Sequence, residues 1–120
     1  MITEDYVSFE IAKLLEEKGF DEKISSYYED NTLCLGEWFE WNRSPFGEIA
    51  APSHAMAMKW LREKGIHIVV YPSNKKPYTL YMVDIGTKTL SLSKGHLRGV
   101  WNTYEQAVEA ALKYCLENLI

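Results

Sequence analysis

The sequence has few of the residues on which most catalytic and metal centres depend. It holds two cysteines and three histidines in 120 residues, with no Cys-x-x-Cys pair and no two histidines four residues apart. Such spacings are typical of zinc sites. The seven glycines stand singly, so no phosphate-binding loop is visible, and no serine lies in a Gly-x-Ser-x-Gly elbow. We therefore expect no cofactor, no metal and no enzymatic activity.

Long hydrophobic runs are also missing. The segment Met1–Asp5 is polar and acidic, unlike a secretory signal, and no apolar run approaches the roughly 20 residues that span a bilayer. These features predict a cytoplasmic protein without membrane contact. In that compartment we expect Cys34 and Cys115 to be reduced, buried thiols rather than a disulfide.

The composition is that of an ordinary globular protein, with 47% hydrophobic and 25% charged residues. The length fits one domain over residues 1–120. Aromatic residues reach 13%, including four Trp and eight Tyr. That content leaves aromatic area for the surface, where it can meet a partner.

The net charge of −4 hides a split along the chain. Residues 1–51 carry twelve acidic and four basic side chains, whereas residues 65–102 carry five basic and one acidic. A split of this kind can steer a partner or drive the chain to associate with itself as a homodimer. The alternative is that each half simply keeps its own outer face solvated.

Two helices are predicted in the first half of the chain. The segment Ser8–Lys18 begins with a good N-cap, repeats apolar residues at helical spacing and ends before Gly19. A second helix is expected over His54–Lys64, capped by Ser53. His54 would then be a solvent-facing residue of the first turn.

The strongest helix signal lies at the C-terminal end. Thr103 and Gln106 form a capping box, and an apolar stripe follows at helical spacing. The stripe is predicted to comprise Tyr104, Ala107, Val108, Ala111, Cys115 and Leu119, widened by Leu112 and Leu116. The core is expected to contain Leu14, Leu15, Trp60, Leu61, Ala107, Val108, Ala111 and Cys115.

Alternating and β-branched segments between these helices predict strands near residues 24–28, 33–41, 66–71, 78–85, 90–93 and 97–101. The order of elements is α-ββ-α-ββ(ββ)-α. The strands are joined by hairpin-length connections, whereas parallel pairing needs long crossovers. We therefore predict an α+β fold, an antiparallel sheet with three helices packed on one face.

Three ordered segments resemble a known group of proteins. They are Ala12–Asp21, Ala51–Lys64 and Thr103–Leu112, and together they span nearly the whole chain. The chain resembles a family of short uncharacterised proteins encoded in phages and mobile elements of anaerobic gut bacteria. The resemblance implies a phage or prophage accessory protein and supplies no activity or site residue. The same segments are also helix caps, helix stops and apolar stripes.

Residues 37–41 mix carboxylates with aromatic rings. Glu37 and Glu40 stand between Trp38, Phe39 and Trp41, a mixture found at sugar-cleaving sites and also on amphipathic strands. If strand alternation continues, both faces carry acidic and aromatic groups, which suits a partner-facing edge. We therefore take Trp38 and Trp41 as candidate contacts with an unknown protein partner or a second copy.

Two alternatives remain open. A metal site could form in three dimensions from Cys34, His54 and a nearby glutamate. The basic segment could also bind nucleic acid, with cations on phosphates and rings on bases, although the acidic net charge opposes this. The candidate residues for that contact are Lys75, Lys76, Lys88, Lys94, Arg98, Tyr78 and Trp101. The leading hypothesis is a non-enzymatic accessory protein that acts through protein–protein interaction.

Overall fold

The structure is a computed structural model that describes residues 2–35, 48–73, 80–87 and 96–120. These residues hold three helices and six strands. The elements are α1 (Phe9–Glu17), β1 (Ser26–Glu29), β2 (Thr32–Leu35), β3 (Ile49–Ala50), α2 (His54–Glu63), β4 (His67–Pro72), β5 (Tyr81–Gly86), β6 (His96–Trp101) and α3 (Tyr104–Asn118). The predicted α+β class and the alternation of helices and strands are confirmed.

The strands form two antiparallel sheets rather than the one we expected. The first has the order β2-β1-β3 and the second β4-β5-β6. The short β3 returns to pair with β1, with Ile49 opposite Tyr28. Helix α2 follows β3, so the first sheet is complete before the chain reaches the strands of the second sheet.

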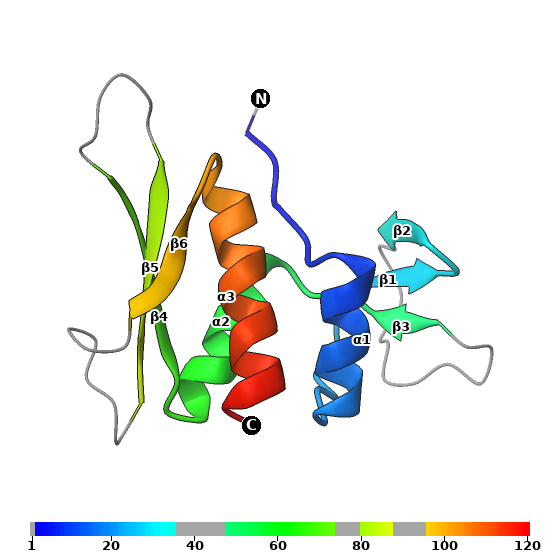
Figure 1. Cartoon of the computed structure of the whole chain (residues 1–120). Coiled ribbons are helices and arrows are strands. Elements are labelled where there is room, and N and C mark those ends of the chain that lie inside the picture. The colour runs from blue at the N-terminus through cyan, green and yellow to red at the C-terminus, as the bar shows by residue number, and fades with distance from the viewer. Residues whose placement is uncertain (1, 36–47, 74–79, 88–95) are drawn as a thin grey trace.

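The two sheets lie at opposite ends of the molecule with the helices between them (Figure 1). Helix α3 is central, because it contacts α1 on one side and all three strands β4, β5 and β6 on the other. Helix α2 packs beside it against β4, and α1 packs against β3. One cluster of buried hydrophobic side chains runs through these layers.

The two shorter helices end in the same way. In α1 the N–H of Gly19 donates to Glu16 and that of Phe20 to Leu15, at 3.1 and 2.9 Å. This is a Schellman ending, and it needs the positive φ of 93° that Gly19 adopts. Helix α2 ends alike at Gly65. Each ending turns an apolar residue back into the core, Phe20 in the first case.

The predicted N-caps are confirmed. Ser8 and Ser53 accept from the backbone of Ile11 and Met56, and Thr103 accepts from Gln106 at 3.1 Å. The predicted stripe of α3 is confirmed over its middle, where the fully buried residues are Ala107, Val108, Ala111, Leu112, Cys115 and Leu116. Tyr104, at the start of the helix, is instead 41% exposed.

The core prediction is right except at one residue. Leu14 is only half-buried, and the others predicted with it are buried. Among the strands, β3 was not predicted, because two residues give no usable periodicity. The expected strand at residues 90–93 and the expected strand residues 36–41 and 78–79 lie outside the described part of the chain.

Trp60 should be the most costly core residue to remove. It is 7% exposed, packs edge-on against Phe20 with ring centroids 5.6 Å apart, and lies under the ammonium of Lys64. We expect Trp60→Ala to lower the free energy of unfolding by about 3–5 kcal/mol, because a large cavity forms. Urea denaturation measures this loss. Lys59→Ala, on the exposed side of the same helix, should change it by less than about 0.5 kcal/mol.

Candidate functional site

A polar cluster joins the three helices. The carboxylate of Glu109 in α3 lies 2.8 Å from Nε2 of His54, the first residue of α2. Both of its oxygens also accept from the backbone N–H of Ser8, which caps α1, at 3.3 Å. One carboxylate therefore holds the starts of two helices against a third.

The expectation that His54 faces solvent is wrong. His54 is 7% exposed, because its helix begins directly under the N-terminal arm. Its backbone N–H donates to the carbonyl of Asp5 at 2.8 Å, and Tyr6 pairs with Ser53 as an isolated β-bridge. A buried histidine needs a partner for its ring, and Glu109 provides it.

Opposing effects act on the pKa of Glu109. Burial alone raises it, but the hydrogen bonds from His54 and Ser8 outweigh burial, so the pKa lies below its ordinary value of 4.5. The same carboxylate acts on Tyr28. The pKa of the Tyr28 phenol is raised, mainly by burial and secondly by the negative charge of Glu109. Its hydroxyl donates to the carbonyl of Val7 at 2.7 Å.

The cluster opens onto a shallow depression of about 390 Å³. Its lining comprises Asp5, Tyr6, Ser8, His54, Glu105, Gln106 and Glu109. A histidine oriented by a carboxylate is also half of a catalytic triad. Within the described residues, however, the ring of His54 makes no side-chain hydrogen bond except that to Glu109, and Ser8 Oγ is engaged at its helix cap. The contacts of the cluster are those of a structural clasp.

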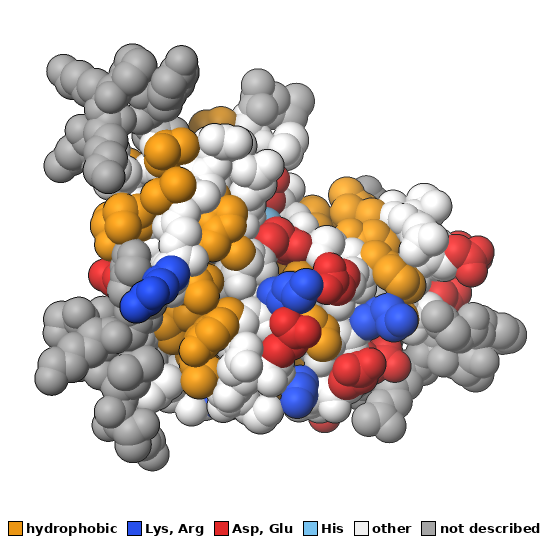
Figure 2. Space-filling view, in the orientation of Figure 1, with side chains coloured by type: hydrophobic (Ala, Val, Ile, Leu, Met, Phe, Trp, Pro, Cys, Tyr) orange, Lys and Arg blue, Asp and Glu red, His pale blue; other side chains and the backbone are white. Residues whose placement is uncertain are grey.

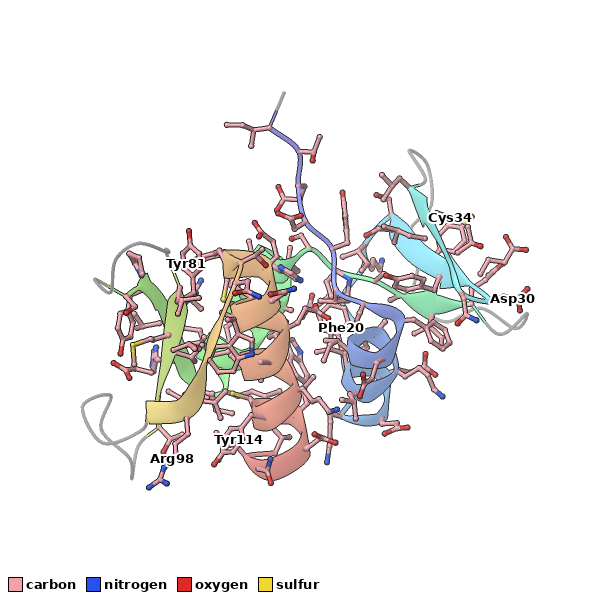
Figure 3. All side chains as sticks on the ribbon, turned by 45° about the horizontal axis from the view of Figure 1, so that its top comes forward. Phe20, Asp30, Cys34, Tyr81, Arg98 and Tyr114 are labelled. Atoms are coloured by element: carbon pink, nitrogen blue, oxygen red, sulfur yellow. The ribbon has the colours of Figure 1, made fainter. Side chains whose placement is uncertain are left out.

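The two cysteines lie in different surroundings. Cys115 is fully buried in α3, and burial raises its pKa to about 12. Cys34 lies in the edge strand β2 and is only partly buried, so the prediction of a second core thiol is wrong (Figure 3). The apolar context of Cys34 between Leu33 and Leu35 suggested a core strand, yet both leucines are exposed.

The second feature is a sheet face that no described helix covers. In β4–β6 one set of side chains packs into the core, including Val70, Val83 and Leu97. The alternate set points away from α2 and α3. This set, which we call the outer sheet face, comprises His67, Val69, Tyr71, Met82, Asp84, Arg98 and Val100.

The outer sheet face is rich in apolar groups. Val69 is 41% and Val100 is 52% exposed, and Tyr71 lies directly opposite Met82 across the β4–β5 ladder, both partly exposed. Figure 2 shows hydrophobic side chains over β6 and α3 and again over the other sheet, whereas charged groups of both signs gather over α1 and the adjacent part of α3. The hydroxyl of Tyr71 also donates to Asp84 at 3.5 Å. The pKa of this phenol is raised, mainly by partial desolvation and secondly by the neighbouring Asp84 carboxylate.

A bulge in β6 shapes this face. Tyr81 pairs with Trp101 and Val83 with Leu97, so two steps along β5 match four along β6. Gly99 sits in the bulge at a φ of 134°, against the Trp101 ring. Along β6, Leu97 and Trp101 pack against the core while Arg98 and Val100 are exposed.

The structure brings together few of the predicted contact residues. Trp38, Trp41, Lys75, Lys76, Tyr78, Lys88 and Lys94 lie outside the described residues. Arg98 is exposed and extends away from the helices (Figure 3), but Trp101 packs against the core from the other side of the strand. Of the described pair, only Arg98 lies on the open face.

Comparison of the chain with protein-family models, curated proteins and solved structures finds no match. Among the described residues, no three His, Cys, Asp or Glu side chains are grouped to hold a metal ion, and Cys34 lies apart from His54. None of the described helices is long and apolar enough to cross a membrane.

Sequence reasoning missed both features. The Glu109 clasp joins residues 55 and 101 positions apart, and no local pattern reports such a contact. The outer sheet face did leave a signal, the unbroken apolar run Ile68–Tyr71. In a sheet covered on one face only, outward positions are ordinarily polar, so an unbroken run indicates that both faces are apolar.

Removal of the Glu109 carboxylate should destabilise the protein in a pH-dependent way. We expect Glu109→Ala to lower the free energy of unfolding by about 1.5–3 kcal/mol at pH 7, the usual range for hydrogen bonds to a charged group. Because the folded pKa is depressed, this contribution is complete above about pH 4.5 and declines as the pH falls through the folded pKa. Denaturation at several pH values measures it, with Glu117→Ala as the exposed control. An equal loss at pH 7 and at pH 3 would contradict the clasp.

The two thiols should differ in reactivity. In native protein at neutral pH, a thiol reagent should label Cys34 and leave Cys115 unmodified, because the latter is buried and its pKa is about 12. Mass spectrometry of the labelled peptides distinguishes them. Labelling of Cys115 at a rate comparable to that of Cys34 would show that α3 opens readily.

Proposed function

We propose that this chain is a non-enzymatic accessory protein that acts in the cytoplasm by binding another protein through its outer sheet face. The observation that carries the proposal is the row of Val69, Tyr71, Met82 and Val100 on a face that no described helix covers. Antiparallel sheets that face water alternate apolar and polar residues, and this sheet keeps apolar side chains outward. Exposed apolar patches of this kind typically mark interaction sites.

The composition of the face supports a protein partner. Tyr71, Met82 and Arg98 belong to the residue types enriched at protein–protein interfaces. The titratable clusters support the absence of catalysis, since His54 is held by Glu109 and the Cys115 thiol is buried. The resemblance to phage and mobile-element proteins supplies the proposed setting, a phage or prophage accessory role.

Binding of nucleic acid is the second candidate. One observation favours it, because Arg98 is exposed on the same face as Tyr71. Proteins that bind single strands combine cationic groups and aromatic rings on one surface. The chain's net charge of −4 opposes it.

Purification from the native host tests both candidates. We expect the tagged protein to retain a protein partner at near-equal amounts, and the double variant Val69→Lys, Val100→Lys to lose it. The matched control is Leu35→Lys, an equally drastic change at a residue 64% exposed on the other sheet, and it should retain the partner. Mass spectrometry and nucleic-acid sequencing identify what co-purifies.

The opposite result is equally clear. Nucleic acid that co-purifies alone and is released steeply by salt would replace the first candidate with the second. Lys75→Glu with Lys76→Glu should then nearly abolish the binding. If the double variant Val69→Lys, Val100→Lys retains a protein partner as well as Leu35→Lys does, the contact lies elsewhere on the chain.

A further inference from the structure

We propose that the occupant of the outer sheet face is a second copy of this chain, related by a two-fold axis with the two sheets face to face and their strands antiparallel. This inference rests on the proposed function, because it names the partner of the same surface. Aligned sheets that pack in this way form the core of β-sandwiches, with their faces about 10 Å apart.

The charges on the surface favour self-association. In a two-fold contact the same patch meets itself, so a patch of one sign repels its copy. The outer sheet face carries both Asp84 and Arg98, in addition to apolar groups. Two other described segments carry a clear excess of one sign. Residues 2–35 hold nine acidic side chains against three lysines, and the exposed end of α2 holds Lys59, Arg62 and Lys64 against Glu63.

A two-fold axis in the plane between the sheets can run along the strands or across them, and the register of the strands favours the second. Val69 pairs with Asp84, and Tyr71 with Met82 two residues along the same ladder. An axis along the strands would stack Asp84 on Asp84 of the second copy, which is repulsive. An axis across the strands reverses their direction and stacks Val69 on Tyr71 of the second copy.

The arrangement with antiparallel strands also pairs the charges. Arg98 lies in β6 beside the row of Met82, and reversal carries it to the row of Asp84 in the second copy, one strand away. Neighbouring strands are about 4.8 Å apart, which an arginine side chain spans. The two-fold axis repeats the contact, so the dimer would contain two Arg98–Asp84 pairs, one on each side of the axis.

The size of the face predicts a weak dimer. Three strands of six residues outline about 14 by 20 Å, or about 300 Å². Stable dimers bury about 800 Å² per partner. We therefore expect a concentration-dependent equilibrium between monomer and dimer rather than a permanent dimer.

Charge-swap variants provide the decisive experiment. The full-length protein is studied by sedimentation equilibrium from roughly 10 µM to 1 mM, a range that suits weak association. Wild-type protein should change from monomer to dimer, and Arg98→Glu and Asp84→Lys should each weaken dimerisation at least about tenfold because like charges then face each other. An equimolar mixture of the two variants should restore dimerisation, since each heterodimer regains two opposite-charge pairs. Thermal melting shows that each variant is folded.

Each other outcome overturns the inference. If Leu35→Lys weakens the dimer as much as Val69→Lys with Val100→Lys, the contact is not the outer sheet face. If the mixture of charge variants stays monomeric, the arrangement with antiparallel strands is wrong. If wild-type protein is monomeric throughout, while host purification yields a partner that depends on Val69 and Val100, the second copy is ruled out and the proposed binding function stands. A monomer without such a partner would contradict both.

Discussion

The burial of α3 on two sides is the constraint on which the rest of the structure depends. Its sheet-facing side meets β5, where Tyr104 packs edge-on against Tyr81, while Glu109 and Lys113 face α1. Its fully buried Ala107 and Ala111 let neighbouring elements approach closely. Because α3 and α2 take up the inner side of β4–β6, the chain has no further described helix for the outer side. The outer sheet face is therefore exposed because α2 and α3 both pack on the opposite face of the sheet.

The polar contacts of α3 follow from the same arrangement. A helix that packs against the starts of two others meets backbone N–H groups without helical partners, and an acidic side chain can satisfy them. Glu109 accepts from Ser8 and from the buried ring of His54. The nearby ion pair of Lys113 with Glu10, at 2.9 Å, is exposed and contributes little by comparison. The contacts of Glu109 thus link the N-termini of α1 and α2 to α3.

Local signals predicted the helices well and the sheet arrangement poorly. Ser8, Thr103 and Gly19 determine helix ends through contacts within a few residues, so the sequence predicts those ends almost to the residue. Strand periodicity indicates which residues alternate, but not which strands pair, and the division into two sheets was therefore missed. The burial of His54 could not be predicted, since its partner Glu109 lies in a different helix. Trp101 faces inward with Leu97, as alternation along β6 indicates, so Arg98 and Trp101, three residues apart, lie on opposite faces and could not line one surface as predicted.

The central claim is that a second copy of this chain binds to the outer sheet face. Methyl NMR spectra recorded across a dilution series observe that surface directly, because Val69, Met82 and Val100 carry methyl groups on it and Leu35 carries methyl groups on the other sheet. We expect the resonances of Val69, Met82 and Val100 to shift together with concentration while those of Leu35 stay in place. Shifts confined to Leu35, or spread evenly over buried and exposed methyl groups, would contradict it.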